Sequence, residues 1–368
     1  MKKFFASVLA LCLMVSMIAC GTNKEDNTSS QGKTASAQEQ SAPAKNNEKS
    51  IVIGVSQCTT QEERWRNDGK ALQVVADRLG IELKMLDAAN DPATQATQIE
   101  NLISSGVDAI LISPTDAEAI LPAIAEAKKS NIPIVIWGRQ VESSDQDFFV
   151  INNFTEVGLG MGQEALKVRP EGRYAIIGGD KSTSVPTEMT NGIMQALQPS
   201  IDSGKIEIVF EQYVTNWMPE GAMSAMENAL TQTKNNVDIV ICHNDGMAGG
   251  AIQALSGQGM DGKVPVIGMD AELAALQRIV EGKQYSTLLF DHAGFAEVGM
   301  NAAYKLAKKE SIDEYVTKTT NIAGADVKTG DIPFRVITAE NVKEICIDSG
   351  LHAMEDVYKN IPADQWPK

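Results

Sequence analysis

From residue 51 onward, short runs of β-branched residues alternate with longer stretches of helical period, and this alternation restricts the fold more than any other feature. The first set of predicted strands and helices, in chain order, covers 51–56, 62–79, 81–86, 92–105, 107–113, 116–130 and 132–137. The predicted strands are apolar along their whole length, which is typical of sheets that are covered on both faces. Strands and helices in this order predict a parallel α/β sheet with right-handed crossovers.

The same pattern then starts again. The second set begins with a strand at 148–152 and a helix at 156–167. It continues with strands at 174–177, 206–213, 238–242, 264–267 and 285–290, followed in turn by helices at 188–197, 221–231, 247–256, 272–280 and 293–308. Two sets of units of similar length predict two similar lobes, each built on a parallel sheet.

The N-terminus carries the marks of export. Lys2 and Lys3 precede an apolar run from Phe4 to Ile18, which is too short and wrongly flanked for a membrane-spanning helix. Ala19-Cys20-Gly21 resembles the lipobox of bacterial lipoproteins, in which the cysteine receives a lipid such as palmitate. We therefore expect a signal peptide over 1–19, a lipidated Cys20 and a location on the outer face of the cell membrane. Ordinary cleavage near Ala19, with an unmodified cysteine, is the alternative.

Residues 21–50 are almost wholly Asn, Ser, Gln, Thr, Ala, Lys and Glu, without an aromatic side chain. Such a segment buries too little apolar surface to offset its ordering entropy, so we expect 20–50 to be a disordered tether that starts at the lipidated residue. The net charge is −16, and removing Lys2 and Lys3 with the signal makes it −18. This acidity argues against nucleic acid as a partner, because proteins that bind nucleic acid need a positive face.

No motif for catalysis, for a cofactor or for a metal stands out. Gly158-Leu-Gly-Met-Gly lies inside a helical pattern rather than after a strand, so it is not a dinucleotide-binding fingerprint. The chain has no Walker loop, nucleophile elbow or H-E-x-x-H motif, and its cysteines lack metal-ligand spacing. We therefore expect no enzyme, no cofactor and no metal. A glycoside hydrolase using Asp245 and Asp270 is the enzyme alternative.

The residues that follow the predicted strands form a candidate site, because ligands of open parallel sheets bind outside the carboxyl ends of the strands. These residues are mostly polar and rich in amides. They comprise 56–60, Asn90, Pro114, Arg139, Asn153, 178–181, Asn216-Trp217, Asn244-Asp245 and Asp270. Such side chains suit an uncharged polyhydroxylated ligand, which needs paired donors and acceptors and a flat apolar surface.

Several segments resemble the type I periplasmic sugar-binding proteins of ABC importers, and within that family the D-xylose-binding group. They include 63–66 (ERWR), 98–103 (QIENLI), 106–114 (GVDAILISP), 217–220 (WMPE), 244–255 (NDGMAGGAIQAL) and 268–273 (GMDAEL). The resemblance implies two Rossmann-like lobes that are joined by three crossing strands and close on a ligand. The implied N-terminal lobe holds 51–153 and 291–320, the C-terminal lobe holds 154–290 and 321–340, and 341–368 form a tail. The third crossing is expected near 319–322.

The resemblance also implies roles for individual residues. Trp65 and Trp217 match the two aromatic residues that sandwich the sugar ring, and the charged neighbours of Trp65 favour exposure in a cleft. Arg64 and Arg139 match arginines that bind sugar oxygens. Asn244 and Asp270 match an amide and a carboxylate that grip adjacent hydroxyls.

The chain departs from the family pattern at three places. Asn153-Phe154 replaces an Asp-Asn pair, Phe290 with Asp291 beside it replaces a lysine, and an asparagine-rich loop has become Ser182-Thr-Ser-Val-Pro. The expected ligand is therefore a monosaccharide, D-xylose or a related aldose, with a cyclic polyol or a small glycoside as alternatives. Asn153, Phe290 and Asp291 complete the expected site.

The resemblance implies that the chain is a monomer that delivers its sugar to the permease subunits of an ABC importer. It is expected to need no cofactor. A sugar sensor that signals to a membrane kinase or chemoreceptor is the alternative, which the sequence does not separate from transport.

Overall fold

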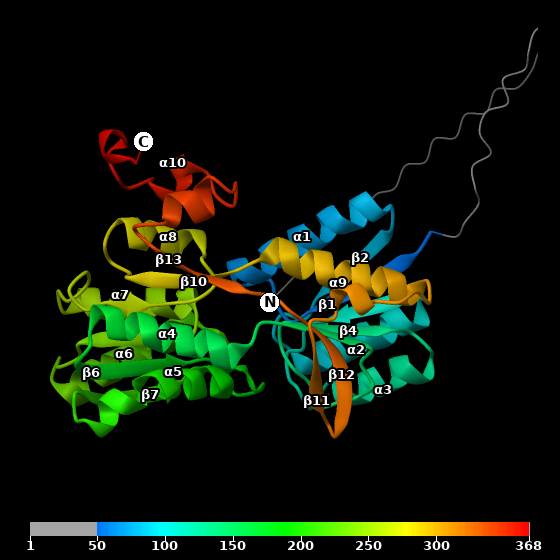
Figure 1. Ribbon diagram of the computed structural model, residues 1–368, viewed down its shortest axis with the longest axis horizontal. Coiled ribbons are helices and arrows are strands. Elements are labelled where there is room, and N and C mark those ends of the chain that lie inside the picture. Colours follow the sequence, from blue (N-terminus) through cyan, green and yellow to red (C-terminus); the bar gives the residue numbers. More distant parts are fainter. Residues whose placement is uncertain (1–49, 368) are drawn as a thin grey trace, which may run out of the picture. The chain divides into compact units, whose positions relative to one another are not determined.

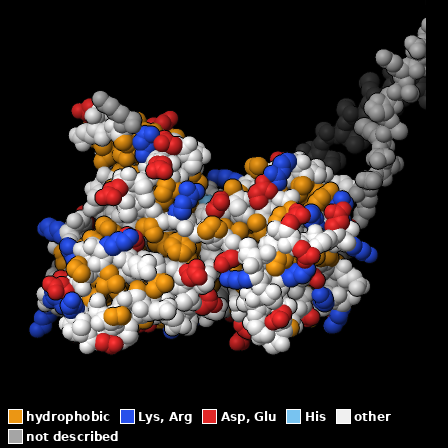
Figure 2. Space-filling model, in the orientation of Figure 1, with side chains coloured by type: hydrophobic (Ala, Val, Ile, Leu, Met, Phe, Trp, Pro, Cys, Tyr) orange, Lys and Arg blue, Asp and Glu red, His pale blue; other side chains and the backbone are white. Residues whose placement is uncertain are grey.

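A computed structural model describes residues 50–367. The expected signal peptide, the lipidation site at Cys20 and the tether up to residue 49 lie outside the described residues. Within residues 50–367, no helix combines the length and the apolar character that crossing a membrane requires. On the face shown in Figure 2, acidic and basic side chains are interspersed over the surface.

The first lobe is built on a seven-stranded sheet in the order β11-β12-β5-β4-β3-β1-β2 (Figure 1). Its strands are β1 (Val52–Gln57), β2 (Glu82–Asp87), β3 (Ala109–Ile112), β4 (Ile134–Trp137), β5 (Phe148–Ile151), β11 (Lys318–Ile322) and β12 (Ala325–Asp331). Its helices are α1 (Glu63–Leu79), α2 (Pro92–Ser104), α3 (Leu121–Lys129) and α9 (His292–Ala307), with the short 3-10 helix η2 (Asp313–Tyr315). All neighbouring strands are parallel except the antiparallel pair β11 and β12.

The second lobe is built on a six-stranded sheet in the order β13-β10-β9-β8-β6-β7. Its strands are β6 (Gly172–Gly178), β7 (Ile206–Tyr213), β8 (Ile239–Cys242), β9 (Val266–Ile267), β10 (Ser286–Phe290) and β13 (Phe334–Thr338). Its helices are α4 (Phe154–Val168), α5 (Val185–Asp202), η1 (Thr215–Trp217), α6 (Pro219–Thr233), α7 (Asp245–Gly257) and α8 (Leu273–Val280). The predicted fold class, two α/β lobes with mainly parallel sheets, is confirmed.

The chain passes between the lobes after β5, after β10 and between β12 and β13. The last passage corrects the expected crossing near 319–322, because these residues form β11 and pair with β12 in the first sheet. Residues 321–331 therefore belong to the first lobe rather than the second. The cause is a two-residue turn at Ala323-Gly324, where both residues have positive φ angles (52° and 79°) that are typical of tight β-hairpins.

Two local expectations also need correction. Helix α3 begins at Leu121 rather than at residue 116, because the Asp116 carboxylate accepts hydrogen bonds from the amides of Glu118 and Ala119 and holds a turn there. Strands β2 and β7 are only partly buried, since they lie at the edges of their sheets.

The glycines in α4 serve helix packing. A Cβ atom at Gly158 would lie 2.0 Å from the carbonyl oxygen of Met189 on α5, and a Cβ atom at Gly192 on α5 would lie 2.0 Å from the carbonyl oxygen of Thr155. Only glycine allows the two helices to approach so closely. The structure thus gives Gly158-Leu-Gly-Met-Gly a packing role inside a helix, where the sequence analysis placed it.

The tail is part of the second lobe. It contains the π-helix η3 (Lys343–Ile347), the short helices α10 (Met354–Val357) and η4 (Ala363–Gln365), and connecting turns. Val342, Cys346 and Val357 pack with Leu276 and Ile279 of α8 in a separate small core. The tail is therefore a folded cover on α8.

Candidate functional site

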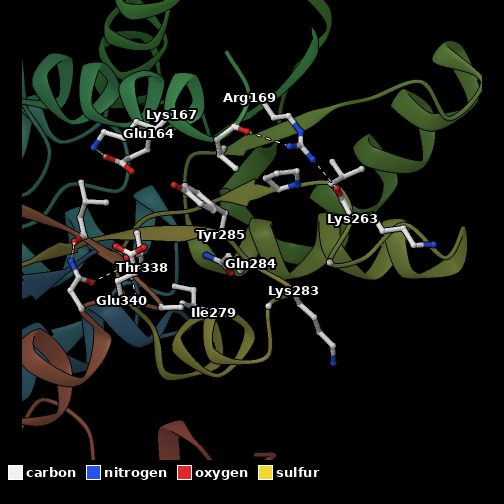
Figure 3. A pocket seen from close by; sticks show the side chains of 18 residues that line it. Glu164, Lys167, Arg169, Lys263, Ile279, Lys283, Gln284, Tyr285, Thr338 and Glu340 are labelled. Atoms are coloured by element: carbon white, nitrogen blue, oxygen red, sulfur yellow. Dashed lines mark hydrogen bonds and ion pairs between the residues drawn. The ribbon is translucent and has the colours of Figure 1, made fainter. Parts of the chain in front are cut away.

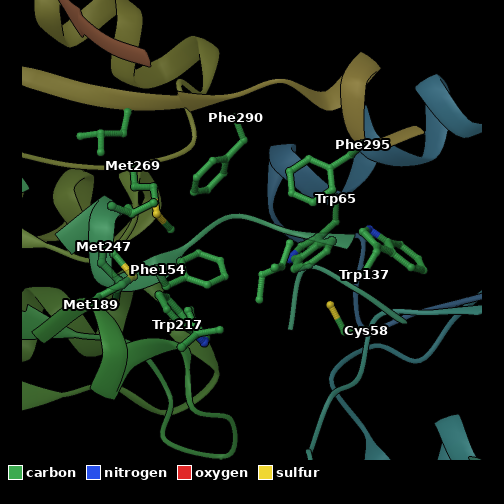
Figure 4. Close-up of a cluster of buried hydrophobic side chains, with 14 of the residues drawn as sticks. Cys58, Trp65, Trp137, Phe154, Met189, Trp217, Met247, Met269, Phe290 and Phe295 are labelled. Carbon is green, nitrogen blue, oxygen red and sulfur yellow. The ribbon is translucent and has the colours of Figure 1, made fainter. Parts of the chain in front are cut away.

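A small cavity lies where side chains from the carboxyl ends of both sheets meet. Its lining comes from both lobes and consists of Glu62, Arg64, Trp65, Gly138, Arg139, Phe154, Val185, Trp217, Asn244, Met269 and Asp270. Its volume is about 20 Å³, which is room for about one water molecule. A ligand as large as a sugar ring would therefore fit only if the two lobes, or the side chains between them, moved apart. Figure 4 shows Trp65 and Trp137 on the side of the first lobe and Phe154 and Trp217 on the side of the second.

Trp65 lies on α1 and is 2% exposed, so the expectation of an exposed side chain is corrected. Its indole nitrogen donates to the Glu62 carboxylate (2.7 Å), and its ring meets Trp137 edge-on at 6.4 Å. The ring also lies close to the backbone of Gly138, where a Cβ atom would come within 3.2 Å of it. These contacts bury and orient the indole, and two of the three, Trp137 and Gly138, come from a distant part of the chain.

Trp217 lies at the end of η1, has a φ of 58° and is 6% exposed. Its ring covers Gly179, since a Cβ atom there would lie 2.3 Å from three ring atoms. The ring is tilted against His243 at a centroid distance of 6.3 Å. Burial lowers the pKa of His243 to about 3, so this imidazole is neutral, and its Nδ1 accepts a hydrogen bond from the Gly179 amide. Each indole thus rests on a glycine.

The two arginines are buried beside Trp65. The Arg64 guanidinium lies 4.5 Å from the Trp65 ring centroid and 4.7 Å from that of Phe290. Its ion pairs are long, 3.8 Å to Asp68 and 3.7 Å to Asp270. Arg64 Nε and Nη2 are buried without a hydrogen-bond partner among the described residues. Such donors are available to a ligand with oxygen acceptors.

Arg139 follows β4, and its Nη1 donates to the carbonyl oxygen of Pro114 (3.1 Å). Its guanidinium lies 5.2 Å from the Trp65 ring centroid, on the same side of the cavity as Arg64. Both guanidinium groups therefore reach the cavity from the first lobe. A hydrogen-bond acceptor faces them from the second lobe.

That acceptor is Asp270. Its φ of 105° is unusual for a residue other than glycine, and its Oδ1 is buried without a hydrogen-bond partner among residues 50–367. Burial raises the pKa of Asp270 well above its ordinary value, against the opposing effect of Arg64. Asn244 lines the cavity beside it and caps α7 through Oδ1, which accepts from the Met247 amide (2.8 Å). Its amide nitrogen is the group left for a ligand.

Three residues of the expected site do not line the cavity. Asn153 and Asp291 cap helices instead, accepting hydrogen bonds from the backbone amides of Glu156 (3.3 Å) and Gly294 (3.0 Å). Phe290 is buried and meets Phe154 edge-on at 5.9 Å. The Phe290 ring contacts Arg64 and Phe154, which line the cavity, without lining it itself.

Two groups near the cavity were missed in the sequence analysis. Glu62 lines the cavity, and its signal was the three-residue spacing to Trp65 at a helix start. Asp68 and His292 form a buried pair (2.5 Å), in which Asp68 also lies near Arg64. No sequence pattern links Asp68 to His292, because α1 and α9 are far apart in the chain and meet only in the folded lobe.

A larger hollow of about 550 Å³ lies on the second lobe, near the start of β10 (Figure 3). Lys167 and Lys283 on its rim are already paired with Glu164 and Glu281. Among the described residues, no group of acidic, histidine and cysteine side chains has the arrangement of a metal site. The small cavity between the lobes is therefore the better candidate for ligand binding.

Comparisons with known proteins agree with the fold. Residues 53–311 match the model of the periplasmic binding protein domain. The D-xylose-binding periplasmic protein of Haemophilus influenzae is 36% identical over 84% of this chain and 93% of its own length. Its Escherichia coli counterpart is 33% identical over 83% and 92%.

Two solved structures share the fold. A solute-binding protein of an ABC transporter from Bacillus halodurans, with bound myo-inositol, has a TM-score of 0.70 and 29% identity, covering 82% of this chain and 98% of its own. One from Clostridium phytofermentans, with bound β-D-glucose, has a TM-score of 0.76 at 23% identity, covering 83% and 99%.

Proposed function

We propose a ligand and a mode of binding for this chain, which belongs to the periplasmic binding protein domain family. The chain is a sugar-binding component of an ABC importer, it acts outside the cytoplasm and it is a binder rather than an enzyme. Its ligand is a monosaccharide, D-xylose or a related aldose, held between the two lobes. The names of its D-xylose-binding relatives support this choice.

One observation carries the proposal. Arg64 Nη2 from the first lobe and Asp270 Oδ1 from the second are buried at the same cavity without hydrogen-bond partners among the described residues. An unmade hydrogen bond of a buried group costs roughly 1–3 kcal/mol. A sugar hydroxyl both donates and accepts, so one ring satisfies both groups. The indoles of Trp65 and Trp217 supply the flat apolar surfaces that the C–H faces of the ring require.

Contacts between the lobes stabilise the closed arrangement. The Glu63 amide donates to the Glu272 carboxylate (3.1 Å), and the Glu63 carboxylate accepts from the Leu273 amide (2.9 Å). At a second contact, the Ala117 amide donates to the Ser182 carbonyl oxygen (3.1 Å). A ligand that touches both lobes adds to these contacts and shifts the population toward the closed form, which the permease then recognises.

The chain acts as a monomer that is lipidated at Cys20 and tethered to the outer face of the membrane by residues 21–50. The basic start, the apolar run and Ala19-Cys20-Gly21 support this part of the proposal. Metabolic labelling with an alkyne fatty acid tests it. We expect label on the native protein and none on the Cys20→Ser variant, and equal labelling of both proteins would contradict lipidation at this residue.

Isothermal titration with D-xylose, D-glucose and myo-inositol tests the ligand. We expect saturable one-to-one binding of at least one of these sugars. Trp217→Ala and Asp270→Ala should each weaken that binding at least tenfold, because each removes a group from the cavity wall. Circular dichroism checks that both variants fold. Unchanged affinity in both folded variants would contradict the assigned site.

A further inference from the structure

Glu62 lines the cavity, and only one of its two carboxyl oxygens has a hydrogen-bond partner among the described residues. It occupies the N-cap position of α1, yet its side chain makes no capping hydrogen bond to the helix. Oε2 instead accepts from the Trp65 indole (2.7 Å). Oε1 is buried at the cavity and has no hydrogen-bond partner within residues 50–367. The helix therefore leaves this oxygen free for another donor.

The charges around Glu62 do not neutralise it directly. Arg64 and Arg139 line the same cavity, but no ion pair within the described chain joins either of them to Glu62. Arg66 is exposed and donates to backbone carbonyl oxygens of the loop before α1. Burial raises the pKa of Glu62, and Arg139 opposes this shift. A buried carboxylate oxygen in this position is stabilised most by a hydrogen-bond donor that enters the cavity.

We propose that Glu62 binds the ligand and determines specificity, accepting a hydrogen bond from a hydroxyl at the end of the sugar that faces the first lobe. Asp270 accepts at the opposite end, from the second lobe. This inference rests on the proposed function and narrows it. The ligand carries a free hydroxyl toward each of these two acidic side chains, which selects an aldose or a cyclitol with unblocked hydroxyls. A glycoside alkylated at the Glu62 end lacks the donor.

Replacing Glu62 by glutamine separates ligand contact from the orientation of Trp65. The amide oxygen of Glu62→Gln still accepts from the Trp65 indole, but its nitrogen does not accept from a hydroxyl. Glu62→Ala removes both interactions. If Glu62 contacts the sugar, Glu62→Gln weakens binding about tenfold to 100-fold, as expected for a hydrogen bond to a charged group. If Glu62 only orients Trp65, Glu62→Gln binds as the native protein does and Glu62→Ala alone is weakened, which would overturn the proposal.

The assay is isothermal titration of the purified chain with D-xylose, D-glucose and myo-inositol, followed by the monodeoxy derivatives of the tightest binder. Loss of the hydroxyl that faces Glu62 weakens binding to the native protein but not to Glu62→Gln, because the two changes remove the same contact. Glu100→Gln, on the exposed face of α2, is the matched control. We expect it to leave affinity unchanged.

The possible failures are distinguishable. If none of the three sugars binds the native protein, the proposed function fails. If one binds the native protein and Glu62→Gln equally well, the inference about Glu62 fails and the sugar site stands. Thermal unfolding without sugar shows whether each variant is folded before its affinity is interpreted.

Discussion

Gly179 supports one wall of the proposed sugar site without lining the cavity itself. It follows β6, and the Trp217 ring lies on its backbone. Alanine at this position would place a Cβ atom 2.3 Å from three atoms of the indole. Carbon atoms in ordinary contact are about 3.5–4.0 Å apart. The ring must therefore move by about 1 Å or more, away from the position in which it forms the cavity wall.

The size of the effect follows from overpacking. Adding a methyl group where no space exists typically costs about 1–3 kcal/mol. We expect the Trp217 ring to relieve the clash by moving into the cavity. A bound sugar must then return the ring to its native position, where it meets the added methyl group of the Gly179→Ala variant. If the whole cost appears in binding, the dissociation constant rises about 5- to 150-fold. If the clash remains in the free protein, the free energy of unfolding falls instead. The loss of binding free energy and the loss of unfolding free energy then add up to the cost of the clash.

Two measurements on Gly179→Ala and one control test this reasoning. Isothermal titration gives the loss of sugar affinity, and urea unfolding without sugar gives the loss of stability. Gly257→Ala, at the end of α7, is the control because a Cβ atom there meets nothing within 4 Å. We expect a combined loss of about 1–3 kcal/mol for Gly179→Ala and no loss of affinity for the control. Native affinity together with native stability in Gly179→Ala would refute the account of Trp217.

Two further predictions concern pH and helix packing. Burial, followed by the Asp245 charge, raises the pKa of Glu272 from 4.5 to about 7, so folding takes up a proton at this carboxyl group. The contribution of this group to the free energy of unfolding is complete below about pH 4.5 and is lost as the pH rises through 7. Urea unfolding should therefore show a loss of stability between about pH 5 and about pH 8 that flattens in Glu272→Gln; an equally steep profile in the variant would contradict the assignment. Gly158→Ala should lower the free energy of unfolding by about 1–3 kcal/mol in urea, because its Cβ atom meets the Met189 carbonyl oxygen. A stability equal to that of Gly257→Ala would show that α4 and α5 separate at little cost.

The fold was predictable because periodicity encodes it. Whole-length apolar strands such as Ile239–Cys242 and amphipathic helices such as Glu63–Leu79 carry their own signals, and parallel strands bring their carboxyl ends together. Four expected site residues that follow strands therefore line one cavity: Arg139, Trp217, Asn244 and Asp270. Arg64 and Trp65 on α1, which the resemblance alone implied, line it as well. Of the other three expected residues, Asn153, which follows a strand, and Asp291 cap helices, and Phe290 packs against Phe154.

What the sequence did not predict depends on contacts between distant segments. The β11–β12 hairpin turns at Ala323-Gly324, and alanine at a positive φ angle is an unusual choice for such a turn. Trp65 is buried by Trp137, Gly138 and Arg139. These residues lie at the end of β4, far from Trp65 in the sequence. The three-residue spacing from Glu62 to Trp65 is visible in the sequence, but only the fold shows that the Glu62 carboxylate lies at the cavity.

A crystal structure with the tightest-binding monosaccharide tests the central claim most directly. We predict one sugar ring between Trp65 and Trp217, with hydroxyls within hydrogen-bond distance of Arg64 and Asp270. A sugar bound elsewhere, or a cavity that binds an amino acid or a metal ion in place of any sugar, would contradict it.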